Sequence, residues 1–388
     1  MLQIQTILVY TLLTIVMYVF SRKAYTTQRK GYQILPIIAF ILVFGLRYSV
    51  GVDWDNYRSI YEEELYGMSF SEMLETRYEI GFIIIVHLCQ YLQLPTYMLF
   101  VFFSAIQIIF LYKALSNDYK VLPYIYLTFI LSGIAIQGFC NVIRQDIAFC
   151  IFLYALTFAK DHRLIPYLLL CTLAACFHKS AIIVFPIYFL WVRRSSIFNR
   201  PITQITIFLI CIIASFASPI QYILGYLEQI ISLVGFEKYT DIAEDMTTSS
   251  YMGPIRIMLI LTYLIIFYHN KRIKEYFNSE IFNRFYDLFF IGGCCYFFFL
   301  GNMMFGRITL YFTNFTFIIL GYALYYYIQQ PKTRATLLGL ISVSLSLIVS
   351  YSSLIFKCQQ NTDAYVSYFQ KDLHPLKDKQ RDSMINNR

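Results

Sequence analysis

The feature that most constrains this chain is the recurrence of long apolar stretches from its first residues almost to its end. A run of about 20 apolar residues crosses a bilayer as a helix, because lipid leaves every backbone polar group to find an internal partner. The pattern therefore predicts an all-α, polytopic membrane bundle. The candidate segments lie at roughly 2–20, 33–48, 80–93, 96–113, 121–139, 145–160, 164–177, 180–192, 202–222, 254–269, 285–300, 307–328 and 335–356.

Composition agrees with this class. Of the 388 residues, 58% are hydrophobic and only 14% are charged, and the mean hydropathy is +0.57. The apolar runs leave no room for a sizeable soluble domain, so we expect a single transmembrane domain over 1–356 and a polar C-terminal tail over 357–388. The first segment lacks a basic leading region and a small-residue cleavage site, which predicts a retained anchor.

The formal net charge of +8 does not indicate nucleic-acid binding. The basic residues form short clusters between apolar runs, as cytoplasmic loops do under the positive-inside rule. The nine cysteines include no CxxC pair and no histidine at ligand spacing, so they predict neither a metal site nor a disulfide framework. We therefore expect no metal and no cofactor.

The loops set the expected orientation. The densest Lys/Arg clusters, at 21–30, 191–200 and 269–284, should be cytoplasmic. The acidic loops 49–79 and 224–253 then face outward as two outer loops.

One segment decides the number of spans. The stretch 80–93 is short and contains His87 and two glutamines, so we interpret it as re-entrant or interfacial. That interpretation leaves about 12 transmembrane helices, and it places the basic loops 113–120 and 160–163 inside.

Under this topology four ionisable side chains gather at the outer ends of helices: Arg47, Arg144, His178 and Arg307. Ionisable residues at membrane depth are rare enough to suggest function. An interfacial anchor explains Arg47 and Arg307 about equally well, and Arg144 has the alternative of a structural pair with Asp146. Arginine forks bind phosphate and pyrophosphate oxygens bidentately, so the three arginines predict a pyrophosphate site.

Groups suited to sugars lie nearby in the sequence. Asp53 precedes Trp54 and Tyr57 in the first outer loop, and Asn141 and Gln145 share a helix face at i,i+4. Aromatic rings stack on sugars, and amide groups bind hydroxyls. A carboxylate or a histidine can act as general base toward a hydroxyl nucleophile, and the candidates are His178, Asp53 and Glu79. The combination fits glycosyl transfer from a lipid-linked pyrophosphate donor.

These motifs resemble, over nearly the whole chain, the EpsG-like branch of the Wzy polymerases of O-antigen and exopolysaccharide repeat units. The matching stretches are "GLRYSVGVDWDNY", "EIGF" at 79–82, "NVIRQDIAF", "FHKSAIIVFPIYFL", "GRITLYF" and "DAYVSYF". The family more often has tyrosine after the acidic residue where this chain has Asp53-Trp54.

The resemblance implies a multi-pass enzyme of a bacterial cytoplasmic (inner) membrane whose active site faces the periplasm or exterior. Such enzymes join undecaprenyl-diphosphate-linked glycans, release undecaprenyl diphosphate and use no nucleotide sugar. We further expect metal-independent activity, contacts with membrane lipids, and a chain-length regulator and a flippase of the same pathway as partners. Two other functions remain open: an O-antigen ligase that transfers polymer to a lipid A core, and a lipid-linked oligosaccharide flippase.

Overall fold

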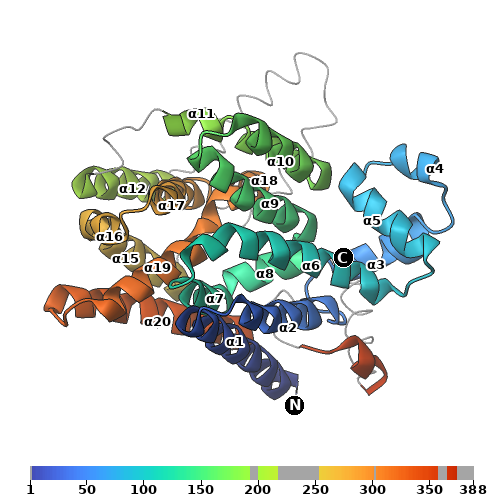
Figure 1. Cartoon of the computed structure of the whole chain (residues 1–388), viewed down its shortest axis with the longest axis horizontal. Helices are drawn as coiled ribbons and strands as arrows, with labels where there is room; N and C mark the ends of the chain where they lie inside the picture. Colours follow the sequence, from blue (N-terminus) through green and yellow to red (C-terminus); the bar gives the residue numbers. More distant parts are fainter. Residues whose placement is uncertain (1, 193–199, 217–252, 301–302, 357–364, 374–388) are drawn as a thin grey trace. The chain divides into compact units, whose positions relative to one another are not determined.

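The computed structural model describes residues 2–192, 200–216, 253–300, 303–356 and 365–373. Over these residues the chain is helical and contains no β-strand, apart from one isolated bridge between Arg47 and Ser367 (Figure 1). The all-α prediction is therefore confirmed. Most of the second predicted outer loop, 224–253, lies outside the described residues.

Among the described residues, four helical stretches are long and apolar enough to cross a membrane: Ile4–Thr27, Tyr97–Asp118, Phe305–Gln329 and Arg334–Phe356. Other apolar helices are 10–17 residues long, shorter than the about 20 residues that a bilayer needs. The predicted count of about 12 spans is not confirmed, because hydropathy marks apolar segments without fixing where each helix ends. The predicted interfacial segment 80–93 forms one of these short helices, Ile80–Tyr91.

Contacts divide the chain into two compact units, and the single transmembrane domain over 1–356 stays a prediction. Unit 1 contains Met1–Tyr188 and Ser350–Arg388, and unit 2 contains Phe189–Val349. The helices of unit 1 are α1 (Leu2–Thr27), α2 (Ile34–Gly45), α3 (Trp54–Ser59), α4 (Phe70–Leu74), α5 (Ile80–Tyr91), α6 (Thr96–Leu115), α7 (Leu122–Leu131), α8 (Ile134–Asn141), α9 (Ile143–Lys160) and α10 (Leu164–Phe177).

In unit 1, α9 packs against both α6 and α10. Its residues 147–153 are fully buried, because their continuous apolar run meets neighbours on every side. Since α9 and α10 are joined by only three residues, they form an antiparallel hairpin. The start of α9 and the end of α10 therefore lie at the same end of the unit.

The basic loops gather at the opposite end of unit 1. Lys113, near the end of α6, lies 5.8 Å from the ring centroid of Tyr154 in α9. Tyr18 in α1 contacts Tyr124 at the start of α7, with ring centroids 5.6 Å apart. The clusters at 21–30, 113–120 and 160–163 thus lie at one end, and the first acidic loop lies at the other.

Part of the predicted polar tail packs into unit 1. The Tyr48 N–H donates to the carbonyl of Val366 at 2.8 Å, and the Tyr368 N–H donates to the carbonyl of Leu46 at 2.7 Å. Tyr365 and Val366 are buried. Residues 365–370 therefore brace the chain where α2 ends.

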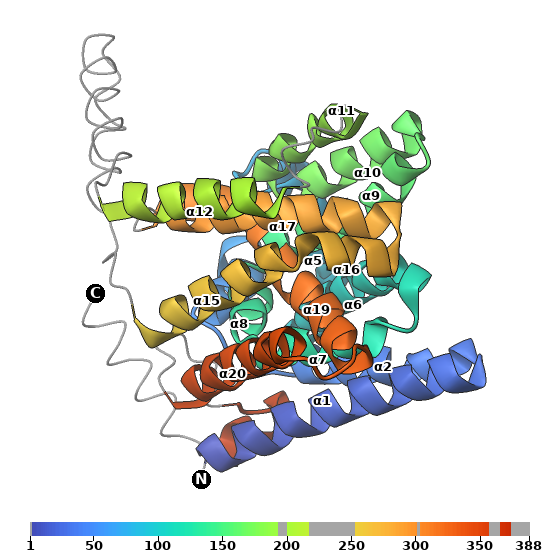
Figure 2. The same ribbon diagram turned by 90° about the vertical axis from the view of Figure 1, so that its left-hand side faces the viewer.

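Unit 2 is built around an aromatic core. Tyr263 stacks on Phe289 at a centroid distance of 4.4 Å, and Phe208 stacks on Tyr263 at 5.3 Å. Figure 2 shows α12 and α17 side by side. The helices are α11 (Ile187–Val192), which begins at the boundary between the units, α12 (Pro201–Phe216), α15 (Pro254–Tyr268), α16 (Asn270–Phe277), α17 (Glu280–Phe298), α18 (Met303–Thr313), α19 (Phe315–Gln329) and α20 (Arg334–Phe356), which ends in unit 1.

Candidate functional site

An ion pair joins two of the predicted site residues in unit 1. Arg144 lies in the first turn of α9, and Glu79 immediately precedes α5. Arg144 Nη1 donates to Glu79 Oε2 at 2.5 Å, and the two side chains are 22% and 10% exposed. A partly buried, charge-assisted pair of this kind is strong, yet it retains access to an incoming ligand.

Aromatic rings surround the Arg144 guanidinium. Its central carbon lies 6.0, 5.6 and 5.3 Å from the ring centroids of Tyr57, Tyr78 and Phe82. Burial raises the pKa of the Tyr57 hydroxyl, and the adjacent Arg144 partly offsets that rise. The hydroxyl therefore stays protonated at neutral pH, and the rings hold the guanidinium in place.

The second oxygen of Glu79 reaches the turn that follows α10. Glu79 Oε1 accepts a hydrogen bond from the backbone N–H of Lys179 at 3.3 Å. In the same turn, His178 Nδ1 lies 2.6 Å from Ser180 Oγ and accepts the Ser180 N–H at 3.3 Å. Glu79 thus connects Arg144 with the His178 turn, and we call Glu79, Arg144 and the His178–Ser180 turn the acidic bridge site.

Gly81 makes this approach possible. A Cβ at Gly81 would lie 2.8 Å from the carbonyl oxygen of Cys176, closer than real Cβ contacts come. The first turn of α5 can therefore lie against the last turn of α10 only with glycine at this position. The sequence marked Gly81 only as part of "EIGF", and the close contact is the physical reason for a glycine there.

Arg47 occupies a different environment from Arg144. Its side chain is 2% exposed and donates to the carbonyls of Phe44, Val50 and Cys140. The guanidinium also lies 4.9 Å from the ring centroid of Phe100. In this conformation Arg47 links the end of α2 to the end of α8. Its contact with pyrophosphate stays a prediction, and it would require the buried side chain to move toward the surface.

The two aromatic residues predicted to stack on sugars are buried. Trp54 is 1% exposed and Tyr57 is 4% exposed. The Trp54 indole donates to the carbonyl of Arg47 at 3.1 Å and stacks on Phe100 with ring centroids 5.5 Å apart. These rings form the core beneath the first outer loop. Sugar stacking on either ring stays a prediction, and it would require the loop to open.

The remaining polar candidates of unit 1 lie around the same loop. Asn141 Oδ1 accepts the Val52 N–H at 2.7 Å, next to Gly51, whose φ of +96° favours glycine. Gln145 is 1% exposed. Asp53 is half-buried at the start of α3 and acts electrostatically on Tyr57. Their predicted roles toward sugars and protons remain predictions.

Arg307 belongs to unit 2. It is exposed and lies near the start of α18. Its predicted role in binding pyrophosphate remains a prediction. Within the described ranges, no group of three or more His, Cys, Asp or Glu side chains is placed to hold a metal ion.

The fold and these contacts define a helical membrane protein with an arginine–carboxylate–histidine cluster at one end of its first unit. The family model of the EpsG family matches residues 30–369. The chain therefore belongs to the EpsG family, which confirms the resemblance, and family membership indicates a polymerase-like membrane protein of polysaccharide biosynthesis. Searches of curated proteins and of solved structures returned no match.

Proposed function

We propose that this protein polymerises undecaprenyl-diphosphate-linked oligosaccharide repeat units on the outer face of the cytoplasmic membrane. The product would be an O-antigen, a capsule or an exopolysaccharide. The observation that carries the proposal is the Arg144–Glu79 ion pair beside the His178 turn in a chain of the EpsG family. This arrangement brings a guanidinium suited to pyrophosphate close to two groups that can accept a proton, the Glu79 carboxylate and the His178 imidazole.

Without substrate, the Glu79 carboxylate is the ion-pair partner of the Arg144 guanidinium. When the donor binds, its pyrophosphate replaces Glu79 as that partner. Arg144 Nε is buried and has no hydrogen-bond partner among the described residues. When the rings around the guanidinium move aside, a pyrophosphate can use this N–H together with a terminal one, as the planar fork requires. Donor binding then breaks the ion pair between Arg144 and Glu79. The Glu79 carboxylate can therefore accept a proton only when substrate is present.

The reaction balances without a further reactant. The hydroxyl oxygen of the incoming repeat unit attacks the reducing-end anomeric carbon of the growing chain, and the bond from that carbon to undecaprenyl diphosphate breaks. The hydroxyl proton passes to a base, for which Glu79, His178 and Asp53 are the candidates. Arg144 stabilises the negative charge that develops on the leaving diphosphate.

A gel of surface polysaccharide from a deletion strain tests this function. A strain that lacks a polymerase carries single repeat units on its surface. A strain that lacks a ligase has a bare core, with the polymer still on the lipid carrier. A strain that lacks a flippase exports neither single repeat units nor polymer. Complementation with the wild-type protein should restore a ladder, and His178→Ala should restore only single units. A deletion strain that shows bare core or no exported units would overturn the polymerase function.

A further inference from the structure

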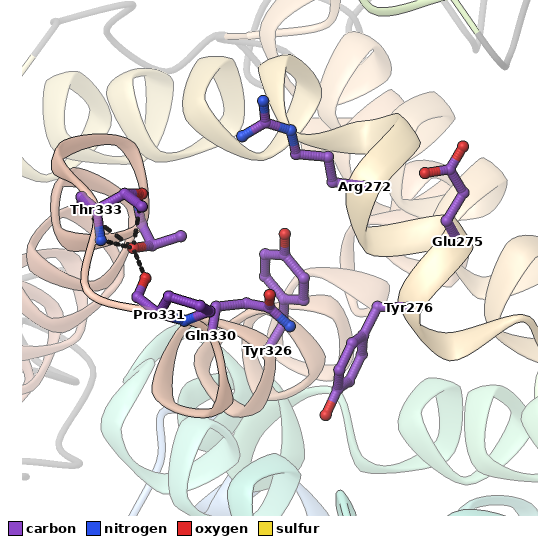
Figure 3. A pocket seen from close by; sticks show the side chains of 8 residues that line it. Arg272, Glu275, Tyr276, Tyr326, Gln330, Pro331 and Thr333 are labelled. Carbon is purple, nitrogen blue, oxygen red and sulfur yellow. Dashed lines mark hydrogen bonds between the residues drawn. The ribbon is translucent and has the colours of Figure 1, made fainter.

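Unit 2 contains a cavity that the proposed transferase chemistry does not use. It has a volume of about 520 Å³, within the range of small-molecule sites. Figure 3 shows its walls, which come from α16 on one side and from the junction of α19 and α20 on the other. The lining residues are Arg272, Glu275, Tyr276, Tyr326, Gln330, Pro331, Thr333 and Thr336.

The cation in this cavity is available to a ligand. Within the part of the chain that the structure describes, Arg272 forms no ion pair. The carboxylate that also lines the cavity, Glu275, lies 3.9 Å from Lys271 on the outer surface of α16. In Figure 3 the guanidinium of Arg272 points away from Glu275.

The neutral polar groups divide into two kinds. The two threonines already form hydrogen bonds within the turn that precedes α20. Thr336 Oγ1 donates to the Pro331 carbonyl at 2.6 Å, and the Thr333 N–H donates to Thr336 Oγ1 at 3.0 Å. The Tyr326 hydroxyl and the Gln330 amide lie opposite Arg272 (Figure 3). Arg272, Tyr326 and Gln330 together offer donors from two walls of the cavity.

The cavity lies where two candidate spans meet. Phe305–Gln329 ends and Arg334–Phe356 begins beside it. If both stretches cross a bilayer, the cavity lies at headgroup depth. The neighbouring α16 is amphipathic: Ile273 is 1% exposed and Phe277 8% exposed. Lys271 and Arg272 are both exposed, and of these two only Arg272 lines the cavity. The Lys/Arg cluster at 269–284 predicts the cytoplasmic side, where anionic lipids gather and basic pockets between helices bind their headgroups.

We propose that this cavity binds a phosphate group through Arg272, with Tyr326 and Gln330 as neutral donors, and that its ligand is an anionic lipid headgroup or a soluble phosphate compound. Arg272 provides the charge-assisted contact, and the two neutral donors complete the coordination of the phosphate oxygens. The site is separate from the acidic bridge site in unit 1, so its success or failure is independent of the polymerase proposal.

Thermal unfolding of the purified full-length protein in neutral detergent tests the proposal. Short-chain phosphatidylglycerol, short-chain phosphatidylcholine and inorganic phosphate are titrated in separate arms. We expect phosphatidylglycerol or inorganic phosphate to raise the melting temperature in a saturable way, because a ligand that binds only the folded state stabilises it. Saturation by phosphatidylglycerol alone identifies the lipid headgroup, and saturation by inorganic phosphate identifies a soluble source.

Arg272→Gln should raise the half-saturating concentration about tenfold, which corresponds to one charge-assisted contact. Lys271→Gln is the matched control, because it removes the same charge from the adjacent, exposed position that does not line the cavity. The control should leave the curve unchanged. No saturable shift in any arm, a shift with phosphatidylcholine equal to that with phosphatidylglycerol, or equal losses in both variants would overturn the proposal.

Discussion

Replacement of Arg144 by lysine separates the charge of this residue from its shape. Lysine keeps a cation that can pair with Glu79, which lies at 2.5 Å from Arg144 Nη1 in the wild-type protein. It loses the Nε donor and the flat face that lies among Tyr57, Tyr78 and Phe82. The lost cation–π contacts cost about 0.5–1 kcal/mol, small against the roughly 5–15 kcal/mol that stabilises a typical domain.

The effect on catalysis should be much larger than the effect on folding. Loss of one donor aimed at developing charge costs about 2.7–4 kcal/mol, a factor of about 10²–10³ in rate. Arg144→Lys should therefore accumulate in the membrane at wild-type levels, as an immunoblot would show, while the polysaccharide ladder collapses to single units. A normal ladder from this variant would refute the bidentate role of Arg144.

Two controls sharpen this test. Arg77→Lys makes the same substitution in a neighbouring arginine whose side chain is 75% exposed, and it should leave the ladder intact. The exchange Arg144→Glu with Glu79→Arg keeps an ion pair between α9 and α5 but moves the cation. If the pair is only structural, the exchange restores the ladder; our mechanism expects a stable and inactive protein.

Three further outcomes are expected. Gly81→Ala should cost about 1–3 kcal/mol through overpacking against Cys176 and reduce the ladder, whereas Gly31→Ala, with open space around it, should behave as wild type in the same gel. Trp54→Ala should cost about 3–5 kcal/mol and lower the amount of protein on an immunoblot, while Trp54→Phe, which keeps a ring against Phe100, should retain most of it; a Trp54→Ala protein of normal abundance that makes altered polymer would instead favour a sugar contact. Polymer synthesis in isolated membranes should continue in excess chelator, because guanidinium groups neutralise the diphosphate; complete loss that added metal restores would contradict this.

Several features were predictable because they depend on local pattern alone. Apolar runs predicted a helical membrane protein, since lipid permits few other ways to satisfy the backbone. The "EIGF" and "FHKS" stretches carried the family resemblance, and they mark Glu79 and His178, two residues of the acidic bridge site. The twelve-span count is not confirmed, because hydropathy does not determine helix length in packed apolar segments.

The sequence by itself determined the class of protein, its family and the candidate residues, because these follow from hydropathy, charge and short motifs. Only the tertiary structure decided which candidates meet. Arg47 and Arg144 look alike in sequence, yet the first donates to three backbone carbonyls in the core and the second pairs with Glu79 at a partly open surface. That difference depends on contacts between residues 65 and 93 positions apart, which no local pattern encodes.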